Sequence, residues 1–164
     1  MAMSDEPEIM MEVTAFLADS VVVADGKLFV QGAGWNIIWV PTFPSQHDRI
    51  GVGILIRVPW TSTNEVHAVG VHLEDGDGRT MPVGRDPEGG PVTTLGGQFS
   101  VGRPPTMPHG DDQIVPIAMN LNGLVFDHPD RYSFVVSLDE VPLSRLPFRV
   151  MLSGGPGVGG CPVA

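Results

Sequence analysis

Histidine and carboxylate side chains gather between residues 67 and 74, where they could ligate a transition metal. A cupin-type metal site places two histidines one residue apart on one strand face, followed by a carboxylate and a third histidine. Here His67 and His72 are five residues apart, so a regular strand points them to opposite sides of a sheet unless a bulge intervenes. His72 and Glu74 share a face, and His128 could approach them. We expect a partly buried His67 and a surface pair of His72 and Glu74. A cupin-like metal-dependent enzyme built on His67, His72 and Glu74 is an alternative.

The acidic turn at residues 74–78, EDGDG, is a second candidate metal site. It offers the carboxylates of Glu74, Asp75 and Asp77, and hard oxygen ligands suit Ca²⁺. An Asp-Gly repeat between two apolar runs is also what a tight hairpin requires, and no glutamate follows at the spacing of an EF-hand. We interpret the segment as a hairpin and keep a Ca²⁺-binding β-sandwich as a further alternative.

Residues for nucleophilic catalysis are not arranged in a known motif. The sequence lacks the Gly-x-Ser-x-Gly turn that presents a nucleophilic serine. Its one cysteine, Cys161, lies in the glycine-rich segment SGGPGVGGCPVA, which offers no rigid neighbours to activate a thiol. We therefore name no catalytic residue, expect no cofactor and favour a protein without enzymatic activity.

The stretch at residues 23–35, VADGKLFVQGAGW, is rich in glycine, as phosphate-binding loops are. A phosphate loop leads into the N-terminus of a helix, where backbone N–H groups meet the anion. The residues that follow here, NIIWV, instead favour a strand, and no Gly-Lys-Ser/Thr motif is present. Asp25-Gly26 lies between two apolar runs, which is the strongest short-range signal for a hairpin. The stretch is predicted to be a turn rather than a nucleotide site.

Trp35, Ile37 and Trp39 alternate along the chain, so a strand would place all three on one face. They could lie in the core, since large aromatic side chains are mostly buried. The residues between them are also mostly apolar, and a strand that is apolar on both faces is either central in its sheet or pairs with another chain. An outward aromatic face would form an interface. We predict that Trp35, Ile37 and Trp39 form an interface with a homo-oligomer or another protein.

These candidates must be positioned by strands, because apolar residues alternate with polar ones between residues 11 and 152. The clearest run is RYSFVVSLD at 131–139, and similar runs occupy 51–58, 66–74 and 115–121, the last marked as an edge or bulged strand by Pro116. Glycine (21 residues) and proline (16 residues) separate many such short runs. The pattern predicts an all-β fold, a single-domain antiparallel β-sandwich of about eight to ten strands that is Ig-like or jelly-roll-like.

The formal net charge of −10 restricts the partners of the protein. Nucleic acids and anionic membranes are bound by neutralising their charge with lysine and arginine, and this chain has one lysine and no basic cluster. We therefore expect no nucleic acid and no membrane as a partner. The acidic start MAMSDEPEIMMEV lacks the features of a signal peptide, so we expect a cytoplasmic protein.

The motifs ADS, DGKL, G-x-GW, VPW, GRPP and LPF occur in this order between residues 11 and 150. In this pattern the chain resembles a family of small uncharacterised proteins common in actinobacteria, a domain of unknown function. The resemblance implies a one-domain β fold and a bacterial origin, and it transfers no activity and no site residues. We predict a disordered acidic N-terminus at 1–10, a β-sandwich domain at 11–152 and a flexible glycine-rich tail at 153–164.

Overall fold

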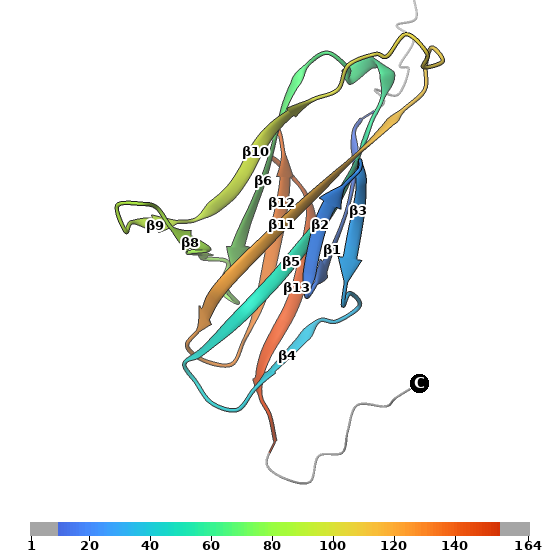
Figure 1. The fold of residues 1–164 in the computed structure, drawn as a ribbon. Helices are drawn as coiled ribbons and strands as arrows, with labels where there is room; N and C mark the ends of the chain where they lie inside the picture. The colour runs from blue at the N-terminus through green and yellow to red at the C-terminus, as the bar shows by residue number, and fades with distance from the viewer. Residues whose placement is uncertain (1–9, 155–164) are drawn as a thin grey trace, which may run out of the picture.

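The computed structural model of the protein describes residues 10–154 and shows an all-β fold (Figure 1). Its one helical element in this range is a short 3₁₀ helix at Trp60–Ser62. The thirteen strands are β1 Glu12–Ala18, β2 Ser20–Ala24, β3 Lys27–Gln31, β4 Ile37–Val40, β5 Ser45–Val58, β6 Val66–Glu74, β7 Thr80–Met81, β8 Gly84–Arg85, β9 Pro91–Val92, β10 Thr94–Ser100, β11 Gln113–Phe126, β12 Asp130–Leu138 and β13 Val141–Leu152.

Two curled sheets form the body of the molecule. The smaller has the order β1-β5-β11, and the larger has the order β10-β6-β12-β13-β4, with β7 added beside β6. All pairs are antiparallel except β13 and β4, which run parallel, so the larger sheet is mixed. The sequence predicted eight to ten antiparallel strands; the parallel pair and the short strands β7, β8 and β9 account for the difference.

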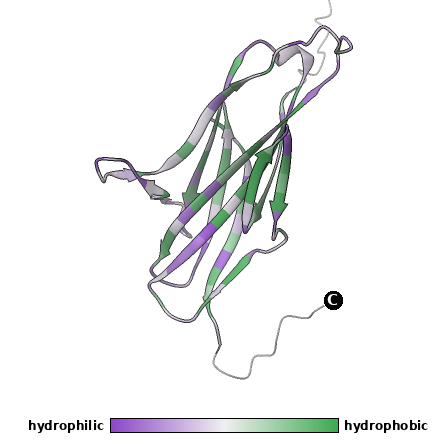
Figure 2. Ribbon diagram, viewed as in Figure 1, coloured by the Kyte–Doolittle hydropathy of each residue, from purple (hydrophilic) through white to green (hydrophobic). Residues whose placement is uncertain are grey.

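A single apolar core lies between the two sheets and follows the predicted alternation. On β12 the alternate residues Tyr132, Phe134, Val136 and Leu138 are buried, and β6 buries its alternate residues in the same way. The middle of β5, residues 50–54, is buried on both faces. Each large side chain that is fully buried contributes roughly 1.5–3 kcal/mol, so this core dominates the stability of the domain. Figure 2 shows hydrophobic and hydrophilic residues alternating along the long strands.

The hairpin of β2 and β3 forms an extra layer on the outer side of β5 and β11. Asp25 and Gly26 both have positive φ, 52° and 68°, as a tight two-residue turn requires, which confirms the predicted hairpin. The Asn120 side chain on β11 accepts a hydrogen bond from the N–H of Val21 (3.0 Å) and donates one to the Val21 carbonyl (2.8 Å). Gly51 on β5 allows the close approach, since a Cβ there would lie 3.1 Å from the backbone of residues 20 and 21.

Strand β11 is an edge strand, as Pro116 predicts, because it pairs with β5 alone. The larger sheet ends at β10 on one side and at β4 on the other, and β4 pairs only with β13. The backbone N–H and the hydroxyl of Ser153 both donate to the carbonyl of Val40, so the chain stays attached to β4 just past the end of β13. The rest of the predicted tail, including Cys161, and nearly all of the predicted acidic N-terminus lie outside the described residues.

Candidate functional site

His67 is held inside the larger sheet by two hydrogen-bond acceptors. Its side chain projects from β6 into the core, and the residue is only 5% exposed. Nδ1 lies 2.9 Å from Oδ2 of Asp139, and Nε2 lies 2.9 Å from the backbone carbonyl oxygen of Ser62. A carboxylate and a carbonyl can only accept, so both ring nitrogens must carry a proton to satisfy them. Burial lowers the pKa of His67, but these two hydrogen bonds and the charges of Asp139 and Glu65 outweigh burial and raise the pKa above 6.5.

Asp139 occupies the tight turn between β12 and β13 and fastens that turn to β6. It has a positive φ of 49°, and its Oδ1 accepts a hydrogen bond from the N–H of Ala68 at 2.8 Å. Burial raises the pKa of Asp139. The hydrogen bonds from Ala68 and His67, together with the charge of His67, outweigh burial, so the net shift of this pKa is downward. The pair is not part of a nucleophilic triad, because Nε2 of His67 faces a backbone carbonyl instead of a hydroxyl.

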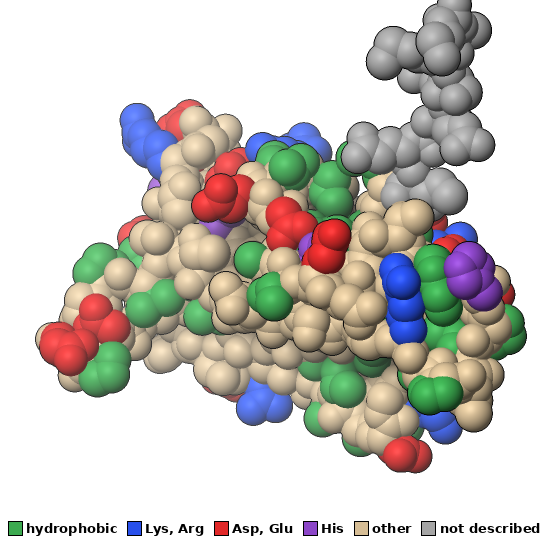
Figure 3. Space-filling view, turned by 90° about the horizontal axis from the view of Figure 1, so that it is seen from above, with side chains coloured by type: hydrophobic (Ala, Val, Ile, Leu, Met, Phe, Trp, Pro, Cys, Tyr) green, Lys and Arg blue, Asp and Glu red, His purple; other side chains and the backbone are tan. Residues whose placement is uncertain are grey.

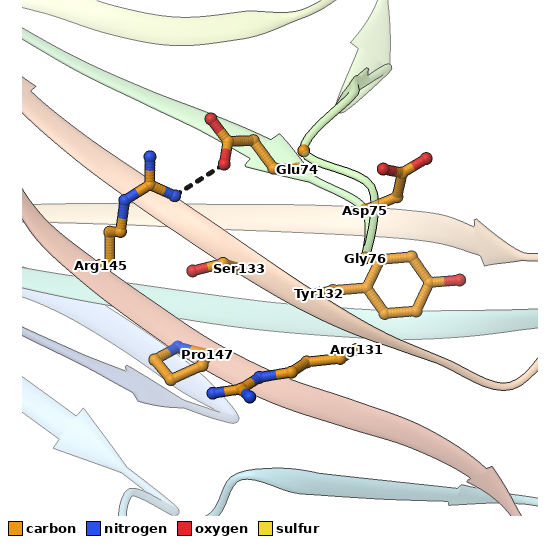
Figure 4. Close-up of a pocket in the computed structure, with 9 residues that line it drawn as sticks. Glu74, Asp75, Gly76, Arg131, Tyr132, Ser133, Arg145 and Pro147 are labelled. Carbon is orange, nitrogen blue, oxygen red and sulfur yellow. Dashed lines mark hydrogen bonds and ion pairs between the residues drawn. The ribbon is translucent and has the colours of Figure 1, made fainter.

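His72 and Glu74 form the predicted surface pair on the opposite face of β6. Nε2 of His72 lies 2.9 Å from Oε1 of Glu74, and the guanidinium of Arg145 on β13 donates to Oε2 at 2.7 Å. Both hydrogen bonds lower the pKa of Glu74, and the one from Arg145 has the larger effect. Glu74, Arg145, Arg131 and Pro147 border an open hollow of about 520 Å³ (Figure 4).

The acidic turn after β6 uses its carboxylates for its own backbone. Oδ1 of Asp75 accepts hydrogen bonds from the N–H groups of Asp77 and Arg79, both at 2.9 Å. The N–H of Gly76 donates to Oδ2 of Asp130 at 3.2 Å. This is the geometry of a hairpin, which was the preferred interpretation of the sequence.

The residues predicted as metal ligands do not converge on one point. His67 faces the core, whereas His72 and Glu74 face outward, so β6 separates the three candidate transition-metal ligands. Glu74 is engaged by Arg145, and Asp75 by the turn, which leaves Asp77 apart in an exposed ion pair with Arg79. Within residues 10–154, no group of three histidine, cysteine or carboxylate side chains is arranged to hold a metal ion.

The predicted interface residues divide between the core and the surface. Ile37 and Trp39 on β4 point outward and are 38% and 57% exposed, while the alternate residues of β4 are buried. Trp35 differs from the prediction, because it precedes the strand. Its ring packs edge-on against the ring of Phe148, with 6.3 Å between the ring centroids. The indole N–H of Trp35 donates to the carbonyl of Gly32. A bend before β4 therefore turns Trp35 away from the outward face.

A groove between β10 and β11 opens the core to the surface. It has a volume of about 480 Å³, and the residues that line it include Val69, Leu95, Gly97, Phe99, Val115, Ile117 and Met119. The strands on its two sides belong to different sheets, and in the described part of the chain neither pairs with a strand across the groove. Both strands therefore present unpaired backbone N–H and C=O groups beside an apolar floor.

Glycines of β10 shape this groove. Gly97 lies between Leu95 and Phe99 on the inward face, and a Cβ there would meet no atom within 4 Å. A Cβ at Gly96 would instead overlap the carbonyl oxygen of Val69, so the backbone of β10 approaches β6 closely. A Gly-Gly pair inside a strand is a sequence signal for a close approach of another backbone or a ligand. The sequence does not show that β10 is unpaired on the side of the groove, which depends on how the strands pair.

The remaining surface is mixed in character. Seen from above, acidic, basic and hydrophobic side chains are interspersed (Figure 3). In the part of the chain that the structure describes, no helix has the length and apolar character needed to cross a membrane.

Comparisons with known proteins identify the family of this chain. No curated protein matches the chain. The structure of Pseudomonas fluorescens alkylpurine DNA glycosylase AlkC bound to DNA containing an abasic site analog is similar over 86% of this chain and 30% of that chain, with 9% sequence identity and a TM-score of 0.41. A likeness of this degree carries no argument about function. A family model matches residues 13–151, and the chain belongs to this family of unknown function, DUF6941.

Proposed function

We propose that this chain is a non-catalytic β-sandwich module that binds another protein by accepting an extended segment between β10 and β11. The observation that supports the proposal is the groove itself, where two unpaired strand edges flank an apolar floor of about 480 Å³. An added strand would satisfy the backbone groups of β10 and β11, and its alternate side chains would fill the space beside Gly97.

Filling the groove from the protein side tests this proposal. Gly97→Leu places a side chain in the open space and leaves the strand edges intact. A library of displayed random peptides is selected on the wild-type protein, and the strongest peptide is titrated by calorimetry into both proteins. We expect binding to Gly97→Leu to be at least about tenfold weaker, or about 1.4 kcal/mol.

Gly102→Leu is the matched control, because a Cβ at Gly102 also meets no atom within 4 Å but lies outside the groove. Hydrogen exchange adds a second readout, since the bound peptide should protect amides of β10 and β11. Equal affinity for Gly97→Leu and wild type, or protection elsewhere, would show that the groove is not the binding site.

Self-association through β4 is a second candidate function. Ile37 and Trp39 project outward from an edge strand, and the exposed Met151 on β13 lies opposite Trp39 in the strand register. Exposed apolar side chains at an unpaired edge favour pairing with a second copy. We expect sedimentation equilibrium to show a homo-oligomer that Trp39→Glu weakens, while Val66→Glu, at an exposed position on β6, leaves it unchanged.

A further inference from the structure

Two arginines face each other on the outer side of the larger sheet. Arg131 on β12 and Arg149 on β13 are directly opposite in the strand register, and both are exposed. Like charges in this position repel each other, so the pair weakens the sheet unless an anion lies between them. Among residues 10–154, neither guanidinium forms an ion pair, whereas Arg145 on the same face is paired with Glu74.

The two arginines border a hollow that suits a carboxylate. It has a volume of about 300 Å³ and is lined by Asn36, Ile37, Arg131, Pro147, Phe148 and Arg149. The lining therefore offers two guanidinium groups and one amide, and it includes no acidic side chain. Figure 4 shows Arg131 extending beside Pro147, away from the ion pair of Arg145 and Glu74.

We infer that this hollow binds the acidic segment at residues 5–8, DEPE, of a second copy of the chain. The segment carries three carboxylates, Asp5, Glu6 and Glu8, and no cation, so its charge complements the two arginines. Two copies that each carry a net charge of −10 repel each other at long range. The attraction of the segment to the two arginines therefore acts together with the apolar contact proposed at β4.

The position of Met10 favours a second molecule as the source of the segment. Met10 borders a hollow together with Leu143, near the beginning of β13. Arg149 lies six residues further along that strand, roughly 20 Å away. A fully extended chain from Met10 to Asp5 spans about 18 Å, so within one molecule the backbone at Asp5 stops short of Arg149, and Glu6 and Glu8 lie further from it. A second copy can present all three carboxylates.

The site is continuous with the surface proposed for self-association. Ile37, which projects outward from β4, also lines the hollow and is paired in register with Arg149. The inference rests on the self-association proposed for β4, and it is independent of the groove between β10 and β11. It adds an electrostatic contact to an apolar one. Salt screens this contact, so the difference in association between wild type and a variant without the two arginines should shrink as salt increases.

A charge exchange between two variants tests the contact. The first variant carries Arg131→Glu and Arg149→Glu, and the second carries Asp5→Lys, Glu6→Lys and Glu8→Lys. Each variant alone brings like charges together and should dimerise more weakly than wild type in sedimentation experiments, whereas an equimolar mixture should form a heterodimer that is tighter than either homodimer. All of the substituted residues that the structure describes are exposed, so both variants should unfold cooperatively at nearly the wild-type temperature.

A neutral variant gives a second measure. Arg131→Gln with Arg149→Gln should weaken the homodimer by about two- to thirtyfold, the range expected for two exposed ion pairs. Arg79→Gln with Arg85→Gln removes the same charge from other exposed positions and should leave the dimer unchanged. Inorganic phosphate serves as a competing probe and should displace the segment only weakly.

The outcomes separate this inference from the proposal on which it rests. A monomeric wild-type protein would overturn both. A wild-type dimer that Trp39→Glu weakens but neither arginine variant affects would overturn the acidic contact alone. The acidic contact would also be overturned if the two variants failed to associate when mixed. The same holds if phosphate bound the two arginines equally well whether or not the acidic segment was present.

Discussion

The buried pair of His67 and Asp139 should make the stability of the protein depend on pH. The change to test is Asp139→Asn, because asparagine tolerates the positive φ of 49° at this position. Its side-chain oxygen can still accept the hydrogen bond from Ala68, so the turn between β12 and β13 is preserved. What the substitution removes is the negative charge beside the imidazolium of His67.

The size of the effect follows from the geometry of the pair. A hydrogen bond to a charged group contributes about 1.5–3 kcal/mol. The side chain of Asp139 is 46% exposed, so solvent screens part of this contribution. We expect Asp139→Asn to lower the free energy of unfolding by about 1–2 kcal/mol near pH 6.

The direction of the pH dependence follows from the raised pKa of His67. A group whose pKa is higher in the folded state stabilises the fold fully below its unfolded value, here 6.5. That contribution is lost as the pH rises through the folded pKa. The lowered pKa of Asp139 keeps its carboxylate charged through this range and down to mildly acidic pH. The difference between wild type and Asp139→Asn should therefore be largest below pH 6.5 and shrink as the pH rises through the folded pKa of His67.

Urea unfolding of both proteins at a series of pH values measures this difference, and the NMR titration of the His67 ring measures its pKa directly. His128→Gln, at an exposed histidine, is the control and should leave the pH profile unchanged. A free-energy difference that stays constant with pH, or a His67 ring that titrates at or below 6.5, would show that the ring is neutral and that the argument from its two acceptors is wrong.

Three further predictions concern single residues. Asn120→Ala should destabilise the protein by about 2–4 kcal/mol, because it leaves the backbone N–H and C=O of the buried Val21 without partners, and hydrogen exchange should show early opening of the β2–β3 hairpin. Gly51→Ala should cost about 1–3 kcal/mol in thermal unfolding, since its Cβ would lie 3.1 Å from the backbone of Ser20. Tyr132 is the one tyrosine of the chain, and burial, aided by nearby carboxylates, raises its pKa to about 12, so the ultraviolet signal of tyrosinate should appear near pH 12 instead of 10.

Local features of the sequence were sufficient for much of the secondary structure. Asp25-Gly26 specifies its own turn, because both residues adopt positive φ without help from distant parts of the chain. Alternating apolar residues such as Phe134 and Val136 identify the buried face of β12, since side chains in a strand alternate with a period of two. Pro116 marks an edge strand, because it lacks the N–H that an inner strand would need.

The spacing of residues also predicted which face of β6 each of its two histidines occupies. His67 and His72 differ by an odd number of positions, so a regular strand separates them, and the structure places them on opposite faces of β6. The sequence could not predict that Asp139 meets His67 or that Arg145 meets Glu74, because those partners are 72 and 71 residues apart.

The surfaces proposed for binding were decided by the tertiary structure. Ile37 and Trp39 face outward because β4 joins β13 in parallel at the end of the sheet, and Trp35 turns inward because the strand begins after it. The groove exists because β10 and β11 belong to different sheets and leave their edges facing each other. Periodicity specifies which side of a strand is apolar. It contains no information on which strand becomes its neighbour, and pairing between distant segments settles that question.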